Sequence, residues 1–180
     1  MTFNLTKKYP ALLELNRLSD TDRINSLKRI FNRDIADNPE FSFRGKKIYP
    51  VKSEGMIDME REFKHLTCKQ IIEESEGKKY PKRVYDPFRS ERLHWIKNHI
   101  EEKVSDSIFE IFSTIERDPK KHKDIYRTYI YNITRKYVIV LEPQLRNNQA
   151  YYLLSAYYLN ETYGEKQMKQ KLSNRLKVVY

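Results

Sequence analysis

Residues 125–160 read "IYRTYIYNITRKYVIVLEPQLRNNQAYYLLSAYYLN", and this stretch decides the class of fold. It contains three short runs rich in β-branched and aromatic residues, at 125–132, 136–144 and 150–160. Turn residues separate the runs near Thr134-Arg135 and at 146–149. Residues 137–141 are apolar on both faces, which is typical of a central strand covered on both sides. We therefore predict three neighbouring antiparallel strands.

Helical patterns lie at both ends of the chain. Residues 10–18 predict a short helix, and residues 19–37 predict a second one with capping residues between Ser19 and Thr21. The run after Gly164 predicts a basic C-terminal helix. The apolar stripes of these helices are Ile24, Leu27, Phe31 and Ile35 near the start, and Met168, Leu172 and Leu176 near the end.

The middle of the chain is less regular. Its segments predict a hairpin at 41–51 that turns at Arg44-Gly45, helical pieces over 57–74, an exposed loop over 75–88, a helix over 89–104, a short strand or helix edge at 107–114 and a basic connection at 115–124. Helices followed by an antiparallel sheet indicate an α+β fold rather than an alternating parallel one. We expect an N-terminal helical extension over 1–40, then a helix packed on a small antiparallel sheet, with a basic C-terminal helix, over 41–180.

Composition limits the classes of function. The 180 residues include 39% hydrophobic residues, with 14 tyrosines and 8 phenylalanines, which suffices for a real core. No apolar run approaches the ~20 residues of a membrane span, and the first residues resemble no secretory leader. We expect a cytoplasmic protein without a membrane partner. The net charge is +10, and residues 81–180 carry 19 basic against 12 acidic residues, or +7, which predicts a polyanion-binding surface there.

Metal and nucleotide chemistry find little support in the sequence. Cys68 is the only cysteine, which excludes an internal disulfide and a zinc site built from cysteines. The four glycines form no phosphate-binding loop, and no G-x-S-x-G motif is present. We expect neither a metal nor another cofactor.

The predicted helix over 89–104 mixes cations with its apolar face. Leu93, Ile96, Ile100 and Val104 form a narrow arc on a helical wheel. Arg89 falls inside this arc and Arg92 at its edge, whereas His94 points away and is predicted to lie on the surface. The arginines either pair with nearby carboxylates such as Asp86 and Glu91, or line a groove between helix and sheet and bind phosphate.

The period of two places polar side chains on the strands. Arg127 shares a face with Tyr129 and Tyr131, and Ser155 shares a face with Leu153, Tyr157 and Leu159. A serine within an apolar strand needs a hydrogen-bond partner. Its hydroxyl contacts a phosphate oxygen if this face lines a groove with Arg92; otherwise it bonds a neighbouring backbone group.

Four segments carry a resemblance to a known group of enzymes. They are "FKHLTCKQI" (63–71), "RVYDPFRSERLHWIKNHIEE" (83–102), "RTYIYNITRKYVIVLE" (127–142) and "YYLLSAYYL" (151–159), the last followed by a basic helix. In this order they resemble the Barnase–EndoU–colicin–RelE-like nuclease superfamily, in particular its phage- and mobile-element-associated branch. The resemblance covers roughly residues 60–180.

The resemblance implies a metal-independent endoribonuclease, often a toxin that cleaves tRNA or mRNA. In this reaction the RNA 2′-OH attacks the adjacent phosphate and leaves a cyclic phosphate and a 5′-OH. The chemistry needs a base near the 2′-OH, a cation for the phosphorane charge and a proton donor to the leaving oxygen. RNA is the implied partner, with a neutralising antitoxin or immunity protein as a further one.

The resemblance also assigns roles by position. Arg92 and Ser155 align with the family's pattern, although the family usually has threonine at the second place. His65 is the preferred base, and Tyr157 the proton donor or a stacking platform for a base. The residues expected to hold or steer the substrate are Arg89, Arg127, Thr67, Lys166 and Lys169. An unambiguous His–Lys or His–His pair is absent, so the alternative is a protein of the same fold that binds nucleic acid or an acidic partner without cleavage.

Overall fold

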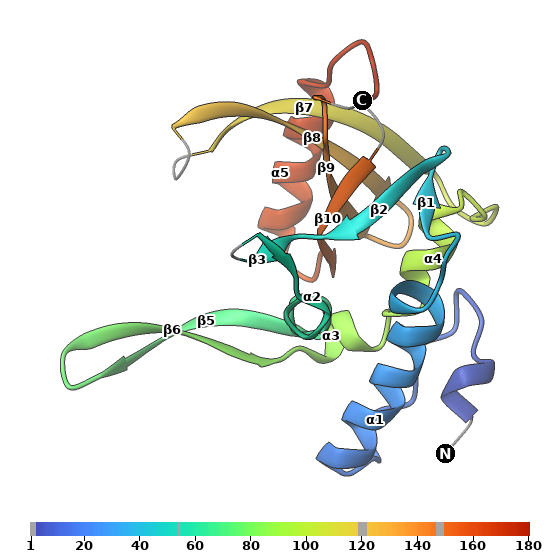
Figure 1. Cartoon of the computed structure of the whole chain (residues 1–180), viewed down its shortest axis with the longest axis vertical. Coiled ribbons are helices and arrows are strands. Elements are labelled where there is room, and N and C mark those ends of the chain that lie inside the picture. Colours follow the sequence, from blue (N-terminus) through green and yellow to red (C-terminus); the bar gives the residue numbers. More distant parts are fainter. Residues whose placement is uncertain (1–2, 54, 119–121, 147–149) are drawn as a thin grey trace.

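A computed structural model describes residues 3–53, 55–118, 122–146 and 150–180 (Figure 1). Its largest feature is a six-stranded sheet in the order β1-β2-β10-β9-β8-β7. The strands are β1 (Ser42–Phe43), β2 (Lys46–Pro50), β7 (Phe109–Asp118), β8 (Lys123–Asn132), β9 (Tyr137–Pro143) and β10 (Ala150–Tyr158). β7 to β10 form an antiparallel meander, and β10 runs parallel to β2. The predicted strands after residue 125 and the hairpin that turns at Arg44-Gly45 are therefore confirmed.

Helices cover both faces of this sheet. They are α1 (Asp20–Phe31), α2 (Met59–Thr67), α3 (Pro87–Ser90), α4 (Trp95–Ile100) and α5 (Thr162–Ser173), with a 3-10 turn at Phe3–Thr6 and a π turn at Asn32–Ala36. One core joins α1, α2 and α4 to the face that carries Ile139 and Leu153, and a second joins α5 to the face that carries Val138 and Val140. The α+β class is confirmed. Within the described ranges, no helix combines the length and apolar character needed to cross a membrane.

The N-terminal region packs into the first core rather than around a core of its own. Ser19 caps α1 as predicted, because its Oγ accepts a hydrogen bond from the Asp22 backbone N–H at 3.2 Å. The helix predicted over 10–18 is wrong: the segment forms turns and extended chain that bury Leu13 and Leu15 against the sheet side. Ile24 is 47% exposed, so it does not belong to the buried stripe of α1.

A long two-stranded hairpin projects from the body below the sheet (Figure 1), and we call it the hairpin arm. It consists of β5 (Cys68–Ser75) and β6 (Lys78–Tyr85), and its tip turns at Glu76-Gly77, both with positive φ. The expected helical pieces are thus confined to α2, and the expected loop over 75–88 is mainly strand. The expected exposure is correct. Because neither face of the arm is buried, its sequence lacks the alternation that marks a half-buried strand.

The helix predicted over 89–104 is interrupted. α3 begins at Pro87 after the Asp86 cap, and α4 begins only at Trp95. Between them the backbone N–H groups of Leu93 and Trp95 bond to carbonyls three residues back, which winds the chain more tightly than an α-helix. This turn rotates His94 inward, where its Nε2 lies 2.9 Å from the Ala11 carbonyl oxygen. His94 is 3% exposed, so the prediction of a surface position is wrong.

The remaining boundaries shift by a few residues. β7 and β8 extend into the predicted basic connection at 115–124, of which residues 119–121 lie outside the described residues. The same holds for residues 147–149 of the turn predicted at 146–149. α5 begins two residues before Gly164 and ends at Ser173, so Leu176 lies beyond it; the Leu176 N–H donates to the Ser113 carbonyl at 2.8 Å.

Candidate functional site

The second half of β10 pairs with β9 on one edge and borders the α2–α3 region, rather than β2, on the other. β2 pairs with β10 only through Leu153, and a bulge follows between Leu153 and Ser155. The bulge places Ser155 opposite Val140 and Tyr157 opposite Val138, both on the face covered by α5. Ser155 and Tyr157 therefore share a face as predicted. Leu153 belongs to the first core instead, because the extra residue of a bulge inverts the alternation.

Arg89 reaches this border from α3. Its Nη1 donates to the His65 carbonyl oxygen at 2.9 Å and to Ser155 Oγ at 3.4 Å. The guanidinium carbon lies 5.7 Å from the centre of the Tyr157 ring, and the Arg89 Nε lies 3.4 Å from an Asp86 carboxylate oxygen. Burial lowers the pKa of Arg89, and Asp86 acts in the opposite direction. Arg89 thus joins α2, α3 and β10 at one point.

Arg92 reaches the other face of the same edge. Its guanidinium carbon stacks 4.0 Å from the centre of the Tyr158 ring and 5.3 Å from that of Trp95. Nη1 donates to the Phe88 carbonyl oxygen at 2.9 Å, while Nε is buried and has no hydrogen-bond partner among the residues that the structure describes. The nearest ion pair, to Glu91, is long at 3.9 Å. The Arg92 side chain is 10% exposed, and burial lowers its pKa.

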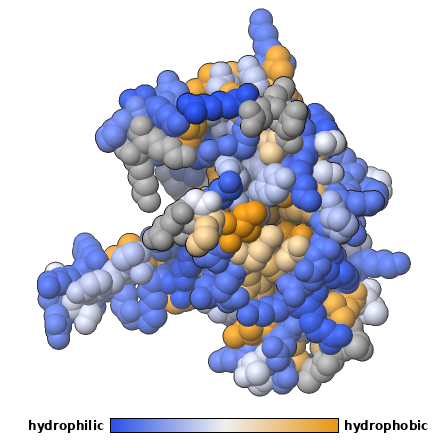
Figure 2. Space-filling model, viewed as in Figure 1, coloured by the Kyte–Doolittle hydropathy of each residue, from blue (hydrophilic) through white to orange (hydrophobic). Residues whose placement is uncertain are grey.

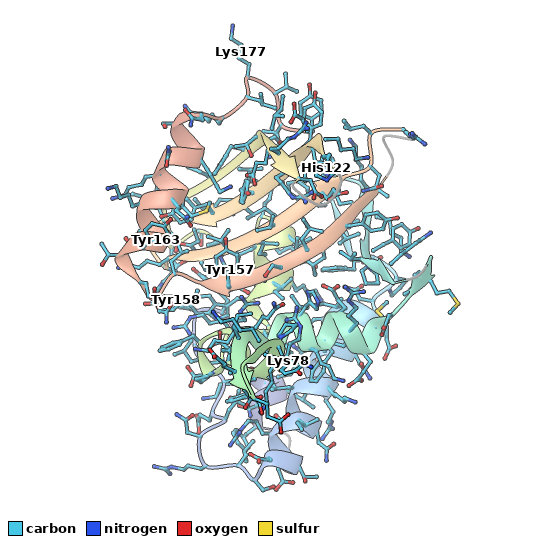
Figure 3. All side chains as sticks on the ribbon, turned by 90° about the vertical axis from the view of Figure 1, so that its left-hand side faces the viewer. Lys78, His122, Tyr157, Tyr158, Tyr163 and Lys177 are labelled. Atoms are coloured by element: carbon cyan, nitrogen blue, oxygen red, sulfur yellow. The ribbon has the colours of Figure 1, made fainter. Side chains whose placement is uncertain are left out.

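We call Arg89, Arg92, Ser155, Tyr157 and Tyr158 the arginine seam. Figure 3 shows Tyr157 and Tyr158 between Tyr163 of α5 and Lys78 of the hairpin arm. Figure 2 shows the molecule indented above the arm, on the side that Figure 3 turns to the viewer. An arginine stays charged even when burial destabilises its cation, so an anion that replaces lost hydration stabilises it. The seam has the chemistry of a phosphate-binding site flanked by aromatic rings.

His65 lies beside the seam on α2. Arg83 of β6 approaches its ring, with 2.9 Å between Arg83 Nη2 and His65 Nε2. Since arginine can only donate, Nε2 accepts and the ring proton resides on Nδ1. Burial, followed by the charges of Arg83, Arg61 and Arg89, lowers the pKa of His65 to about 4. His65 is therefore neutral at pH 7, and its accepting nitrogen is occupied by Arg83.

Tyr157 supplies a phenol to the same place. Burial raises its pKa, and the charge of Arg89 only partly offsets this effect. The phenol is protonated at neutral pH and acts as a donor rather than a base. Ser155 adds a half-buried hydroxyl that accepts a hydrogen bond from Arg89 and retains its own proton for a further acceptor.

Two predicted substrate-binding residues lie elsewhere. Thr67 is 3% exposed, and its hydroxyl donates to the Phe63 carbonyl at 2.8 Å, as expected for a residue in the last turn of α2. Arg127 forms an ion pair with Glu142, the residue across from it on β9. The Glu142 carboxylate thus balances the charge of this guanidinium. The spacing of the two residues in the sequence did not predict the pair. Thr67 and Arg127 therefore take no part in the arginine seam. Lys166 and Lys169 are exposed along α5 and take no part in the seam.

Sequence reasoning missed three contributors to the site. Tyr158 pairs with Tyr137 of the first core and so lies on the face of β10 opposite to Tyr157, where Arg92 stacks on it. Phe88 stacks on Tyr158 with 5.8 Å between ring centres and is 43% exposed. Arg83 was hidden in a segment predicted as loop. The signal available in the sequence was the run of aromatic and basic residues over 80–92.

In the described part of the chain, no three His, Cys, Asp or Glu side chains lie close enough together to hold a metal ion. The chain matches no protein-family model, no curated protein and no solved structure.

Proposed function

We propose that this protein is a metal-independent endoribonuclease that binds the sugar–phosphate chain of RNA at the arginine seam. The observation that carries the proposal is Arg92. Its side chain is 10% exposed, and its guanidinium stacks on Tyr158. Among the described residues its Nε has no hydrogen-bond partner, and the nearest carboxylate oxygen is 3.9 Å away. Such a cation is costly to bury unless an anion completes its surroundings. A phosphodiester, with two unesterified oxygens, fits the planar donor face of arginine.

The seam offers a group for each part of a metal-free cleavage. Arg89 and Arg92 stabilise the additional negative charge of the phosphorane. His65 is neutral and accepts the 2′-OH proton once Arg83 leaves its Nε2, and the 2′ oxygen forms a bond to phosphorus. The bond from phosphorus to the 5′ oxygen then breaks, and the Tyr157 phenol protonates that leaving oxygen. The products are a 2′,3′-cyclic phosphate and a 5′-OH.

A non-catalytic RNA-binding protein is the second candidate, and one observation favours it. His65, the histidine beside the seam, has a pKa of about 4 and an accepting nitrogen bonded to Arg83. A base so weak and so occupied limits proton transfer at neutral pH. Both candidates predict salt-dependent RNA affinity, so binding alone does not separate them. A toxin neutralised by a protein partner fits the first candidate only.

The test is cleavage in the absence of metal. Purified full-length protein is incubated with total cellular RNA in EDTA, and the fragment ends are mapped. The proposal predicts new 2′,3′-cyclic phosphate and 5′-OH ends, lost in Arg89→Gln and retained in Arg127→Gln. RNA that stays intact at high protein concentration, yet is bound, establishes the second candidate. Cleavage that requires Mg²⁺ contradicts the mechanism.

A further inference from the structure

A separate basic pocket adjoins the seam at the root of the hairpin arm. Its volume is about 540 Å³, within the ~300–1,000 Å³ of many ligand sites. We call it the His65 pocket, and it is lined by Asp58, Glu60, Arg61, Lys64, His65, Gln70, Pro81 and Arg83. It lies between α2 and the two strands of the arm. No large apolar side chain lines it.

The charges in this pocket are unbalanced. Arg61, Lys64 and Arg83 form no ion pair with any described residue. The two acidic side chains of the pocket have other roles. Asp58 caps α2 by accepting from the Arg61 N–H at 2.9 Å, and Glu60 pairs with Lys28 of α1 at 3.0 Å. Three cations thus line the cavity with two carboxylates that bond elsewhere, which leaves an excess of one positive charge.

The pocket and the seam are continuous through His65. Arg83 contacts the imidazole from the pocket, while Arg89 donates to the His65 carbonyl from the seam. The charges of Arg61, Arg83 and Arg89 all act on the same imidazole. A chain of regularly spaced negative charges is the ligand that matches such a row of cations. An acidic protein segment fits less well, because protein partners also need apolar anchors and the pocket offers none.

We infer that the His65 pocket binds a second phosphate of the RNA chain, next to the phosphate held at the arginine seam. This inference rests on the proposed function and defines its substrate as a polynucleotide with more than one phosphate, rather than a dinucleotide. Arg61, Lys64 and Arg83 are the binding groups. When Arg83 turns to the phosphate in the pocket, it releases His65 Nε2. His65 is then free to accept the 2′-OH proton next to the phosphate held at the seam.

The experiment removes the two pocket cations that make no contact with the seam. The variant is Arg61→Gln with Lys64→Gln, both exposed on α2. The matched control is Lys8→Gln with Arg29→Gln, two exposed cations outside the pocket, so both double variants lose the same charge. The probe is an uncleavable 2′-O-methyl RNA of eleven nucleotides, whose dissociation constant is measured over a range of salt concentrations.

For a single strand, each phosphate contact contributes about 0.7 to the slope of log affinity against log salt. The pocket holds one phosphate, so the pocket variant is expected to lower that slope by about 0.7, and the control is expected to leave it unchanged. Equal slopes and equal affinities in the two variants would overturn the inference. A loss of affinity for free inorganic phosphate alone, without a change in slope for the RNA, would also overturn it, because the pocket would then bind a free ion.

A second measurement separates this inference from the proposed function. Wild-type protein is given chimeric DNA strands with one ribonucleotide, either as an eleven-mer or as a dinucleotide with a single phosphate, with all four bases at the ribonucleotide. The wild type is expected to cut the eleven-mer faster than the dinucleotide, and the pocket variant to lose most of this preference. A wild type that cuts neither contradicts the proposed function, and the pocket is then judged by the salt slope.

Discussion

The arginine seam and the sheet surface beneath α5 are both basic and aromatic, but they differ in the ion pairs that their cations form. Under α5, Arg127 pairs with Glu142. Lys171 pairs with Glu116, which also accepts a hydrogen bond from the Tyr129 hydroxyl. Burial tends to raise the pKa of Glu116, yet the bonds from Lys171 and Tyr129 keep it below its ordinary value. In the seam, Arg92 has one carboxylate oxygen at 3.9 Å, and its neighbours are rings and carbonyls.

This difference shows that net charge alone does not indicate whether a basic surface gains from binding an anion. A surface with balanced ion pairs gains little from an anion, because binding must first break a pair that is already satisfied. A buried cation without such a pair gains both charge balance and hydrogen bonds. The count of +7 over residues 81–180 includes both kinds. The two kinds of cation are distinguished only by where the folded chain places its acidic residues.

The largest expected effect comes from Arg89. Arg89→Gln removes the cation that joins His65, Ser155 and Tyr157, so kcat/KM for RNA cleavage should fall by about 10²–10³. Arg127→Gln removes the same charge from the paired surface and should leave cleavage within about twofold. Cleavage rates of both variants, with circular dichroism to verify folding, make the comparison. Equal losses of cleavage rate in the two variants would show that the two regions do not differ in their role in cleavage.

Replacing Arg92 by methionine should mainly affect RNA affinity, whereas replacing Arg127 by methionine should mainly affect the free energy of unfolding. Arg92→Met should weaken RNA binding about tenfold, since a charge-assisted contact is lost. Its unfolding free energy should change by less than about 1 kcal/mol, because a flexible apolar chain of similar length keeps the stacking. Arg127→Met should retain RNA affinity and lose about 1–2 kcal/mol of stability with its ion pair. Urea unfolding and RNA titration measure both quantities, and a large stability loss in Arg92→Met would mark that arginine as structural.

The pH profile examines His65 itself. The neutral imidazole is the active form of a base, and its pKa is about 4. The value of kcat/KM should therefore fall on the acid side with a midpoint near 4 and stay level from there to neutral pH. Burial is the largest cause of the lowered pKa of His65, and the charge of Arg83 is the next. Arg83→Gln should move the midpoint upward. An acid limb that is unchanged in His65→Gln would exclude this histidine as the base.

The smallest effect is expected at Ser155. Its hydrogen bond from Arg89 is long at 3.4 Å, so Ser155→Ala should lower the cleavage rate by only about threefold. Ser155→Thr keeps the hydroxyl and should restore the rate. Single-turnover kinetics resolve a difference of this size. A loss as large as that of Arg89→Gln would show that the hydroxyl touches the reacting phosphate directly.

The sheet was predictable because its signal is local. Residues 137–141 are buried on both faces, and the apolar runs on each side end at turn residues. The hairpin arm was not predictable in the same way, since none of the residues from 69 to 83 is buried and no alternation arises. The bulge after Leu153 likewise leaves no mark in the apolar pattern, so Leu153 was placed on the wrong face.

The site was predicted in part. Helical spacing singled out Arg89 and Arg92, and the strand period placed Ser155 with Tyr157. The partner of Arg127 depends on the register between β8 and β9, a contact between residues fifteen positions apart. Arg83 depends on the path of the hairpin arm back to α2. Contacts of this kind follow from tertiary structure, which a single sequence does not reveal by pattern.

RNA phosphate should meet the seam arginines, Arg89 and the weakly paired Arg92, and leave Arg127 with Glu142. Nuclear magnetic resonance of the arginine side-chain Nε–H groups tests it directly, during titration with the uncleavable 2′-O-methyl RNA. Our account predicts that the Arg89 and Arg92 signals shift and become protected from exchange, while the Arg127 signal stays in place. A shift at Arg127 with unchanged signals for Arg89 and Arg92 would contradict it.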